Sequence, residues 1–177
     1  MKKISSQLQK VIIVAAAMTA TVTAFGQSIA EDIRPGKDAT AVSVQGAFIF
    51  TSGSSTGLLQ GSYGKFLTDN IELELSPIFI SSNSGGSTTT IYDIQVTGQY
   101  YFSKGRVCPY VNAGLGVVGV SNGGSSGSTY VIGAGVEYFQ SSKASIFIEA
   151  DQEQFNTSGS TTSATLVSIG LKFYLGK

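Results

Sequence analysis

Hydrophobic and polar residues alternate over long segments of this 177-residue chain. Between residues 71 and 82, for example, the apolar residues Ile71 and Leu73 alternate with Glu72 and Glu74. A period of two is typical of a β-strand with one apolar and one polar face, and no segment shows the 3.6-residue period of an amphipathic helix. Clusters of Gly, Ser, Thr and Asn separate the alternating segments. We predict eight strands, at residues 40–51, 56–67, 71–82, 89–102, 107–121, 129–139, 144–155 and 164–175.

The segments are long, and the connections between them alternate in character. Strands in soluble sheets average about 5 or 6 residues, whereas a tilted membrane strand needs about 9–11. Short connections that contain charge, such as 68–70 and 103–106, alternate with longer uncharged ones, such as 81–89 and 156–163. Short turns at one rim and longer loops at the other are typical of outer-membrane barrels. We therefore predict an all-β fold, an eight-stranded antiparallel up-and-down transmembrane β-barrel with both ends at the short-turn rim.

Aromatic residues on the apolar faces are expected to form two bands. In a membrane barrel such rings gather at both interfaces and leave an aliphatic belt between them. The residues expected near the short-turn rim are Tyr63, Tyr100, Phe102, Tyr138 and Phe173. Those expected near the loop rim are Phe48, Phe50, Phe79, Tyr92 and Tyr130. Aromatic residues grouped near the two rims of the barrel favour a membrane barrel over a soluble, lipocalin-like barrel that encloses an apolar ligand.

The first 38 residues follow a different pattern. Three lysines, Lys2, Lys3 and Lys10, precede an apolar run at residues 11–20, and an A-x-G cleavage site follows at 24–26. This is the pattern of a secretory signal peptide, and the run is too short to cross a bilayer as a helix. We divide the chain into a signal peptide (1–26), a flexible N-terminal lead-in (27–38) and an outer-membrane β-barrel domain (39–177).

Composition narrows the location and the partners. Mean hydropathy is +0.19, and after removal of the signal peptide 8 basic residues stand against 11 acidic ones, a net charge of −3. This balance argues against nucleic acid as a partner. The single Cys108 cannot form an internal disulfide, and we expect a structural thiol. An exported, apolar, Gly-rich chain without a helical span can satisfy its backbone in a bilayer as a closed barrel, so we predict the bacterial outer membrane, with its lipid as partner.

Residues 106–120, RVCPYVNAGLGVVGV, resemble a strand motif of a known family. The motif is the PYxxxGxGxG strand of the small outer-membrane β-barrel domain family, which includes OmpA- and OmpX-like, porin-family barrels. Pro109, Tyr110, Gly114 and Gly116 fit the motif, and Gly119 lies one position beyond the place of its third glycine. We expect Gly114 and Gly116 to point inward beside bulkier residues such as Tyr110, because small barrels alternate large and small side chains to fill their taper.

The end of the chain is similar to the family's barrel-assembly signal. In this signal a polar residue, a glycine, an aromatic residue and a hydrophobic residue follow one another with the spacing polar-x-Gly-x-x-aromatic-x-hydrophobic. The residues that fit it are Ser168, Gly170, Phe173 and Leu175. This resemblance implies an interaction with the barrel-assembly machinery during biogenesis.

Residue types exclude most enzymatic chemistry. The chain contains no His, so Ser-His-Asp and Cys-His arrangements and His-based zinc or iron sites are impossible. Glycoside hydrolysis by two carboxyls would need a substrate-sized cleft, and an eight-stranded barrel is barely wide enough for its own side chains. We predict no enzymatic activity, no catalytic residue and no cofactor.

The polar faces of the predicted strands carry more acids than bases. The residues predicted to form a charged cluster in the lumen are Glu72, Glu74, Asp93, Glu137, Glu149, Asp151, Glu153 and Lys172. Counted from the loop at 156–163, Lys172 lies opposite Phe147. Glu149 is then within diagonal reach on the same face of the neighbouring strand, which makes a salt bridge between Lys172 and Glu149 plausible. Seven carboxylates in a narrow core are very costly unless water fills the lumen, carboxyls share protons or cations neutralise them. The spacing of a Ca²⁺ site is absent, and we predict no metal ligands.

Three functions fit this pattern. The favoured one is an outer-membrane barrel with a structural role, or a narrow pore that prefers cations because its lumen is acidic. The alternatives are a surface binding or adhesion barrel that acts through its loops, and the soluble ligand-binding barrel. The sequence leaves the oligomeric state open.

Overall fold

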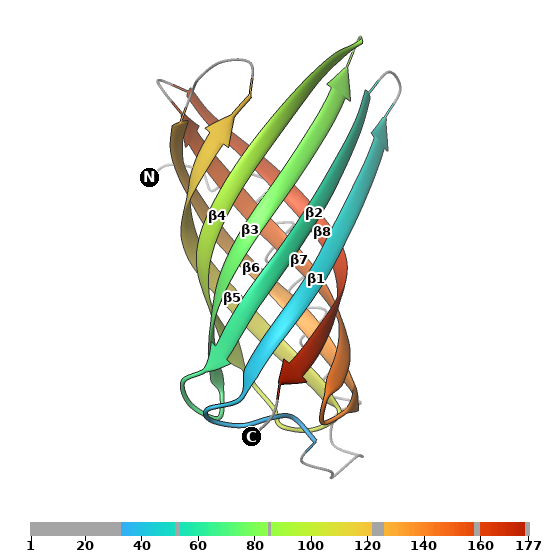
Figure 1. The fold of residues 1–177 in the computed structure, drawn as a ribbon, viewed down its shortest axis with the longest axis vertical. Helices are drawn as coiled ribbons and strands as arrows, with labels where there is room; N and C mark the ends of the chain where they lie inside the picture. Colours follow the sequence, from blue (N-terminus) through green and yellow to red (C-terminus); the bar gives the residue numbers. More distant parts are fainter. Residues whose placement is uncertain (1–32, 52–53, 85, 122–125, 158–159, 176–177) are drawn as a thin grey trace, which may run out of the picture.

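The chain folds into a closed barrel of eight antiparallel strands arranged in chain order, with β8 hydrogen-bonded to β1 (Figure 1). The computed structural model describes residues 33–51, 54–84, 86–121, 126–157 and 160–175. The strands are β1 Thr40–Thr51, β2 Ser54–Phe66, β3 Ile71–Ser84, β4 Ser87–Tyr101, β5 Val107–Val120, β6 Ser126–Ser141, β7 Ala144–Thr157 and β8 Ser160–Leu175. The prediction of an up-and-down eight-stranded barrel is confirmed.

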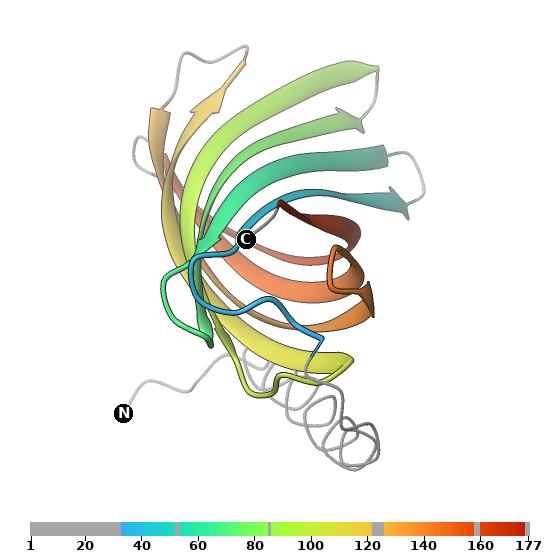
Figure 2. The same ribbon diagram turned by 60° about the horizontal axis from the view of Figure 1, so that its bottom comes forward.

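The connections between strands lie at two ends of the barrel, which we call the turn end and the loop end. The turn end carries the β2–β3, β4–β5 and β6–β7 connections, together with the start of β1 and the end of β8 (Figure 1). The loop end carries the other four connections. The predicted signal peptide and most of the predicted lead-in lie outside the described residues, whereas the segment 33–38 lies across the mouth of the barrel at the turn end (Figure 2).

The strands run further toward the loop end than predicted. β3 and β4 pair out to Ser84 and Ser87, and β7 and β8 pair out to Thr157 and Ser160. The prediction of long loops at residues 81–89 and 156–163 is therefore wrong. Ser, Thr and Asn resemble loop residues in a sequence, but their side chains also bond across strands, as where the Asn83 amide donates to the Thr88 hydroxyl at 3.3 Å.

The apolar face of each strand points outward. Exposed aliphatic residues such as Leu115, Val117 and Ile169 surround the barrel, each more than half exposed. The exposed aromatic residues are Tyr63, Phe79, Tyr92, Tyr100, Phe102, Tyr130, Tyr138 and Phe173, as expected for the two bands. The side chains of Phe48 and Phe50 lie outside the described set. A soluble lipocalin-like barrel would carry this apolar face inside, so that alternative is wrong.

The inner face consists of layers. At the turn end, an aromatic cluster fills the lumen, with Phe66, Tyr101 and Phe139 fully buried beside Tyr110 and Tyr174. Near the loop end, a smaller aliphatic cluster contains Leu58, Ile78, Ile80 and Leu166. Burying one large apolar side chain contributes about 1.5–3 kcal/mol. Polar side chains occupy the lumen between the two apolar clusters. The interior of the barrel is therefore apolar toward both ends and polar in the middle.

In the described ranges, no helix combines the length and the hydropathy needed to cross a membrane.

Candidate functional site

All eight residues of the predicted lumen cluster lie inside the barrel. Their exposed fractions range from 0% for Glu72 and Glu137 to 7% for Asp151. They come from five strands, and each occupies the inward position of the alternating pattern. The cluster divides into two groups, which differ in the charge of their hydrogen-bond donors.

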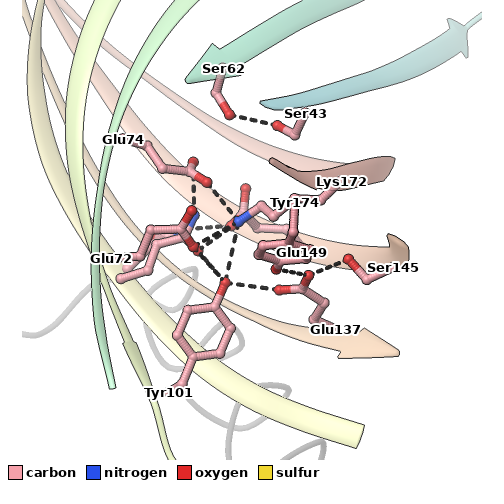
Figure 3. A network of polar contacts seen from close by, with 12 residues as sticks. Ser43, Ser62, Glu72, Glu74, Tyr101, Glu137, Ser145, Glu149, Lys172 and Tyr174 are labelled. Carbon is pink, nitrogen blue, oxygen red and sulfur yellow. Dashed lines mark hydrogen bonds and ion pairs between the residues drawn. The ribbon is translucent and has the colours of Figure 1, made fainter. Parts of the chain in front are cut away.

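Lys172 is the centre of the first group, shown in Figure 3. Its Nζ lies 2.6 Å from Glu74 Oε1 and 3.0 Å from Glu72 Oε2. Small partners, Ser43 on β1 and Ser145 on β7, flank Lys172 in the sheet and leave room for its side chain to cross the lumen to β3. Both salt bridges are buried, so the carboxylates depend on this lysine for their neutralisation.

The predicted salt bridge from Lys172 to Glu149 is wrong. The strands continue to Thr157 and Ser160, so the centre of the β7–β8 hairpin falls one residue earlier than the sequence suggested. Lys172 is therefore paired with Ser145 rather than with Phe147, two positions further from Glu149.

Hydroxyl groups complete the first group, and sequence analysis did not single them out. Tyr101 donates its hydroxyl to Glu137 Oε2 at 2.8 Å and accepts a hydrogen bond from Lys172 Nζ at 3.2 Å. The hydroxyls of Ser145 and Tyr174 donate to the other oxygen of Glu137. The available signal was position, because each of these residues occupies an inward place in its strand. We use the name lysine group for Glu72, Glu74, Glu137, Lys172 and Tyr101.

The second group, Asp93, Glu149, Asp151 and Glu153, is held by neutral amides, and we call it the amide group. Asn112 Nδ2 donates to Glu149 Oε2 at 2.6 Å and to Asp151 Oδ1 at 3.0 Å. The amide of Gln95 donates to Asp93 Oδ2 at 2.8 Å and to Glu153 Oε1 at 3.2 Å. No salt bridge within the described part of the chain reaches this group.

A small cavity of about 20 Å³ lies between the two groups. A polar cavity of this size can hold about one water molecule. Its lining includes Glu74 from the lysine group and Glu149, Asp151 and Glu153 from the amide group, together with Asn112.

Arg34 lies at the turn end against the aromatic rings, a contact that no sequence pattern indicated. Its guanidinium lies 4.9 Å from the ring centre of Tyr101 and 5.3 Å from that of Phe66. Its Nε donates to the Ser103 carbonyl at 3.1 Å, and Nη2 donates to the Asp69 carbonyl. A cation over two aromatic faces, with carbonyl partners on two turns, ties the lead-in segment to the barrel.

The predicted barrel-assembly residues divide between the two faces of β8. Ser168 and Gly170 face the lumen, where a Cβ on Gly170 would collide with the Phe147 ring. Phe173 and Leu175 face outward and are 47% and 52% exposed. The glycines of β5 also divide, since Gly114 and Gly116 face the lumen, as predicted, whereas a Cβ on Gly119 would meet no atom within 4 Å.

The two groups combine buried carboxyls with one lysine, hydroxyl donors and amide donors. Among the described residues, no group of three or more Asp, Glu or Cys side chains could hold a metal ion in a conventional site. The Cys108 thiol donates a hydrogen bond to the Gly105 carbonyl at 2.9 Å, which is a structural contact.

Comparison with solved structures places the fold among outer-membrane barrels. The N-terminal β-barrel domain of Pseudomonas aeruginosa OprF is 19% identical, with 80% of this chain and 100% of that chain covered and a TM-score of 0.52. Neisserial surface protein A is 15% identical, with 76% and 94% covered and a TM-score of 0.60. The outer membrane enzyme PagL is 18% identical, with 77% and 98% covered and a TM-score of 0.50. At these identities the likeness concerns the fold alone.

Comparison with protein families extends to almost the whole sequence. No curated protein matches the chain. The family described as the OprF membrane domain matches residues 5–177. The chain therefore belongs to the OprF membrane domain family and is a β-barrel of the bacterial outer membrane.

Proposed function

We propose that this protein is a structural outer-membrane barrel whose lumen is closed in its resting state. The observation that carries the proposal is the aromatic cluster at the turn end, where Phe66, Tyr101 and Phe139 have no exposed surface. Arg34 covers the rings of Phe66 and Tyr101 from the outside. The lysine group and a cavity of about 20 Å³ follow above the cluster, and an ion could not pass without displacing side chains.

A narrow pore that prefers cations is the second candidate. Seven buried carboxylates and one buried lysine line the described lumen, so an opened lumen would attract cations and repel anions. Opening requires a rearrangement of the aromatic cluster, which makes the pore a property of a minor state rather than of the resting barrel.

Conductance of the purified protein in planar bilayers tests both candidates. The unaltered protein is expected to give no steady current. The double substitution Arg34→Ala and Phe66→Ala removes the cover and one ring, and is expected to give a small current that prefers K⁺ over Cl⁻. Phe79→Ala is the matched control, because Phe79 lies on the lipid face and is 42% exposed.

A steady current through the unaltered protein would contradict the closed barrel. A current through the double variant that prefers anions would contradict the cation-preferring lumen. Heat-modifiable mobility on gels shows whether each variant has folded before its current is interpreted.

Adhesion through loops receives less support. The β3–β4 and β7–β8 connections are short hairpins, and the described residues nearest the loop end are Ser, Thr, Asn and Gly. Such a surface lacks the aromatic and Arg anchors that binding hot spots favour.

We also propose that the end of β8 is read by the barrel-assembly machinery. Phe173 and Leu175 point outward at the turn end, where they are accessible to a partner before insertion. Replacing both with Ser is expected to reduce recovery of the protein in the outer-membrane fraction severalfold. Replacing Val167 and Ile169 with Ser is the control and should reduce it less, because these two residues are also exposed on the outer face but lie earlier in β8, away from the end of the strand.

A further inference from the structure

The cavity in the lumen has the chemistry of an ion site rather than of a trapped water alone. We propose that it binds one monovalent cation, such as Na⁺ or K⁺, held by oxygen atoms of the amide group and of Asn112. The site lies in the middle of the barrel, between the lysine group and the aliphatic cluster near the loop end.

The first argument is charge. Glu149 and Asp151 both place a carboxyl oxygen within 3.0 Å of the same nitrogen, Asn112 Nδ2, so the two carboxyls lie very close together. Asp93 and Glu153 share the Gln95 amide in the same way. An amide supplies hydrogen bonds but no charge, and buried carboxylates without a positive partner are very costly.

The described cations of the lumen and its mouth are engaged elsewhere. Lys172 pairs with Glu72 and Glu74, and Arg34 lies under the aromatic cluster at the turn end. The amide group therefore receives no positive charge from these two side chains.

The second argument is a pair of unpartnered oxygens. Asn112 Oδ1 and Glu153 Oε2 are buried and make no hydrogen bond, and both residues line the cavity with exposed fractions of 5% and 3%. Buried polar atoms in native proteins almost always have a partner. Carboxylate and amide oxygens are hard donors of the kind that hold alkali and alkaline-earth ions.

Size and ligand set favour a monovalent ion. The cavity holds about one water-sized occupant. Ca²⁺ needs 6–8 oxygen ligands, and no three carboxylates of the described chain converge as a conventional metal site requires. An alkali ion tolerates a mixed set of one or two carboxylates and amide oxygens.

Ion-dependent stability tests the site in the folded protein. Unfolding by urea is measured in detergent micelles at pH 8, in NaCl, KCl or choline chloride of equal concentration, so that screening is constant and only the small cations can enter. Na⁺ or K⁺ is expected to raise the folding equilibrium constant relative to choline. Above its dissociation constant, a tenfold increase of the ion should raise that constant up to about tenfold.

Variants locate the effect. Glu153→Gln and Asp151→Asn are expected to lose the difference between Na⁺ or K⁺ and choline, whatever their overall stability. Asp69→Asn is the control, because it removes an exposed carboxylate in the β2–β3 turn and should keep the difference.

Three outcomes would overturn the proposal. Equal stability in all three salts would mean that protons or water alone occupy the cavity. Stabilisation by Ca²⁺ but not by Na⁺ or K⁺ would indicate a divalent site. A difference between salts that persists in both lumen variants would place the bound ion elsewhere.

Discussion

At the scale of the residue, Lys172 has the largest expected effect. It neutralises two buried carboxylates, with Nζ 2.6 Å from Glu74 and 3.0 Å from Glu72. Lys172→Met leaves both carboxylates without a positive partner, and we expect it to lower the free energy of unfolding by about 3–5 kcal/mol. Urea unfolding in micelles at neutral pH measures the change.

Lys65 supplies the matched control for that substitution. It lies on the outer face of β2 at the turn end and is exposed, so Lys65→Met should change stability by less than about 1 kcal/mol. Adding Glu72→Gln and Glu74→Gln to Lys172→Met should restore part of the loss. Equal losses for the two lysine variants would contradict the role of the buried salt bridges.

At the scale of the element, β5 shows why the position of a glycine matters. A Cβ on Gly114 would lie 2.6 Å from the Val96 carbonyl and 2.7 Å from the Thr97 hydroxyl, whereas one on Gly119 meets nothing within 4 Å. We expect Gly114→Ala to destabilise the barrel by about 1–3 kcal/mol through overpacking. Gly119→Ala should be neutral or stabilise by up to about 1 kcal/mol, because alanine restricts the unfolded chain.

The same urea unfolding assay compares the two glycine variants directly. They lie on one strand and make the same chemical change, so their difference isolates the contacts at the inner wall. Similar stabilities would show that neighbouring strands separate easily enough to admit a methyl group.

The turns also act as elements, because Asp69 in the β2–β3 turn joins two other segments. Lys104 of the β4–β5 turn donates a hydrogen bond to Asp69 Oδ2 at 2.8 Å, and the Lys37 backbone N–H donates to Oδ1 at 3.0 Å. These contacts, that of Lys104 first, lower the pKa of Asp69 from 3.8 to about 2. The folded state has the lower pKa, so this contribution to stability is present above about pH 4 and is lost as the pH falls toward 2.

Titration of the Asp69 carboxyl by NMR checks this arrangement. Lys104→Ala is expected to raise the pKa of Asp69 toward 3.8, because the strongest partner of the carboxylate is gone. Lys143→Ala, in the separate β6–β7 turn, is the control and should leave the titration unchanged. A pKa that stays near 2 without Lys104 would assign the shift to the backbone contact instead.

At the scale of the whole molecule, closure of the sheet should dominate stability. β8 pairs with β1 over seven positions, from Thr40 with Leu175 to Gly46 with Ile169, so every strand of the barrel has two hydrogen-bonded neighbours. We expect the folded protein to keep its compact form in cold detergent and to migrate differently on gels before and after boiling. Identical migration of boiled and unboiled samples would contradict a stable closed barrel.

The alternation along the chain was sufficient to predict which face of each strand is buried. Glu149, Asp151 and Glu153 occupy every second position of β7, and a strand with that period has to send all three side chains to one side. The apolar composition of the opposite face and the absence of His then made an outer-membrane barrel without a His-based active site the favoured interpretation. These inferences rest on local geometry, which the sequence contains.

Contacts across the lumen depended on register and on long-range closure. Lys172 contacts Glu72 across one hundred residues of chain, and a hairpin centre misplaced by one residue was enough to assign it a wrong partner. Arg34 packs against the Tyr101 ring because the folded barrel brings aromatic rings from several strands together at its mouth. No single strand contains this set of rings. The sequence by itself determined the strands, their two faces and their surroundings, because these follow from the period of two and from hydrophobicity. Only the tertiary structure decided which charges are neutralised and which rings pack together in the turn end of the lumen, because both depend on side chains that converge from different strands.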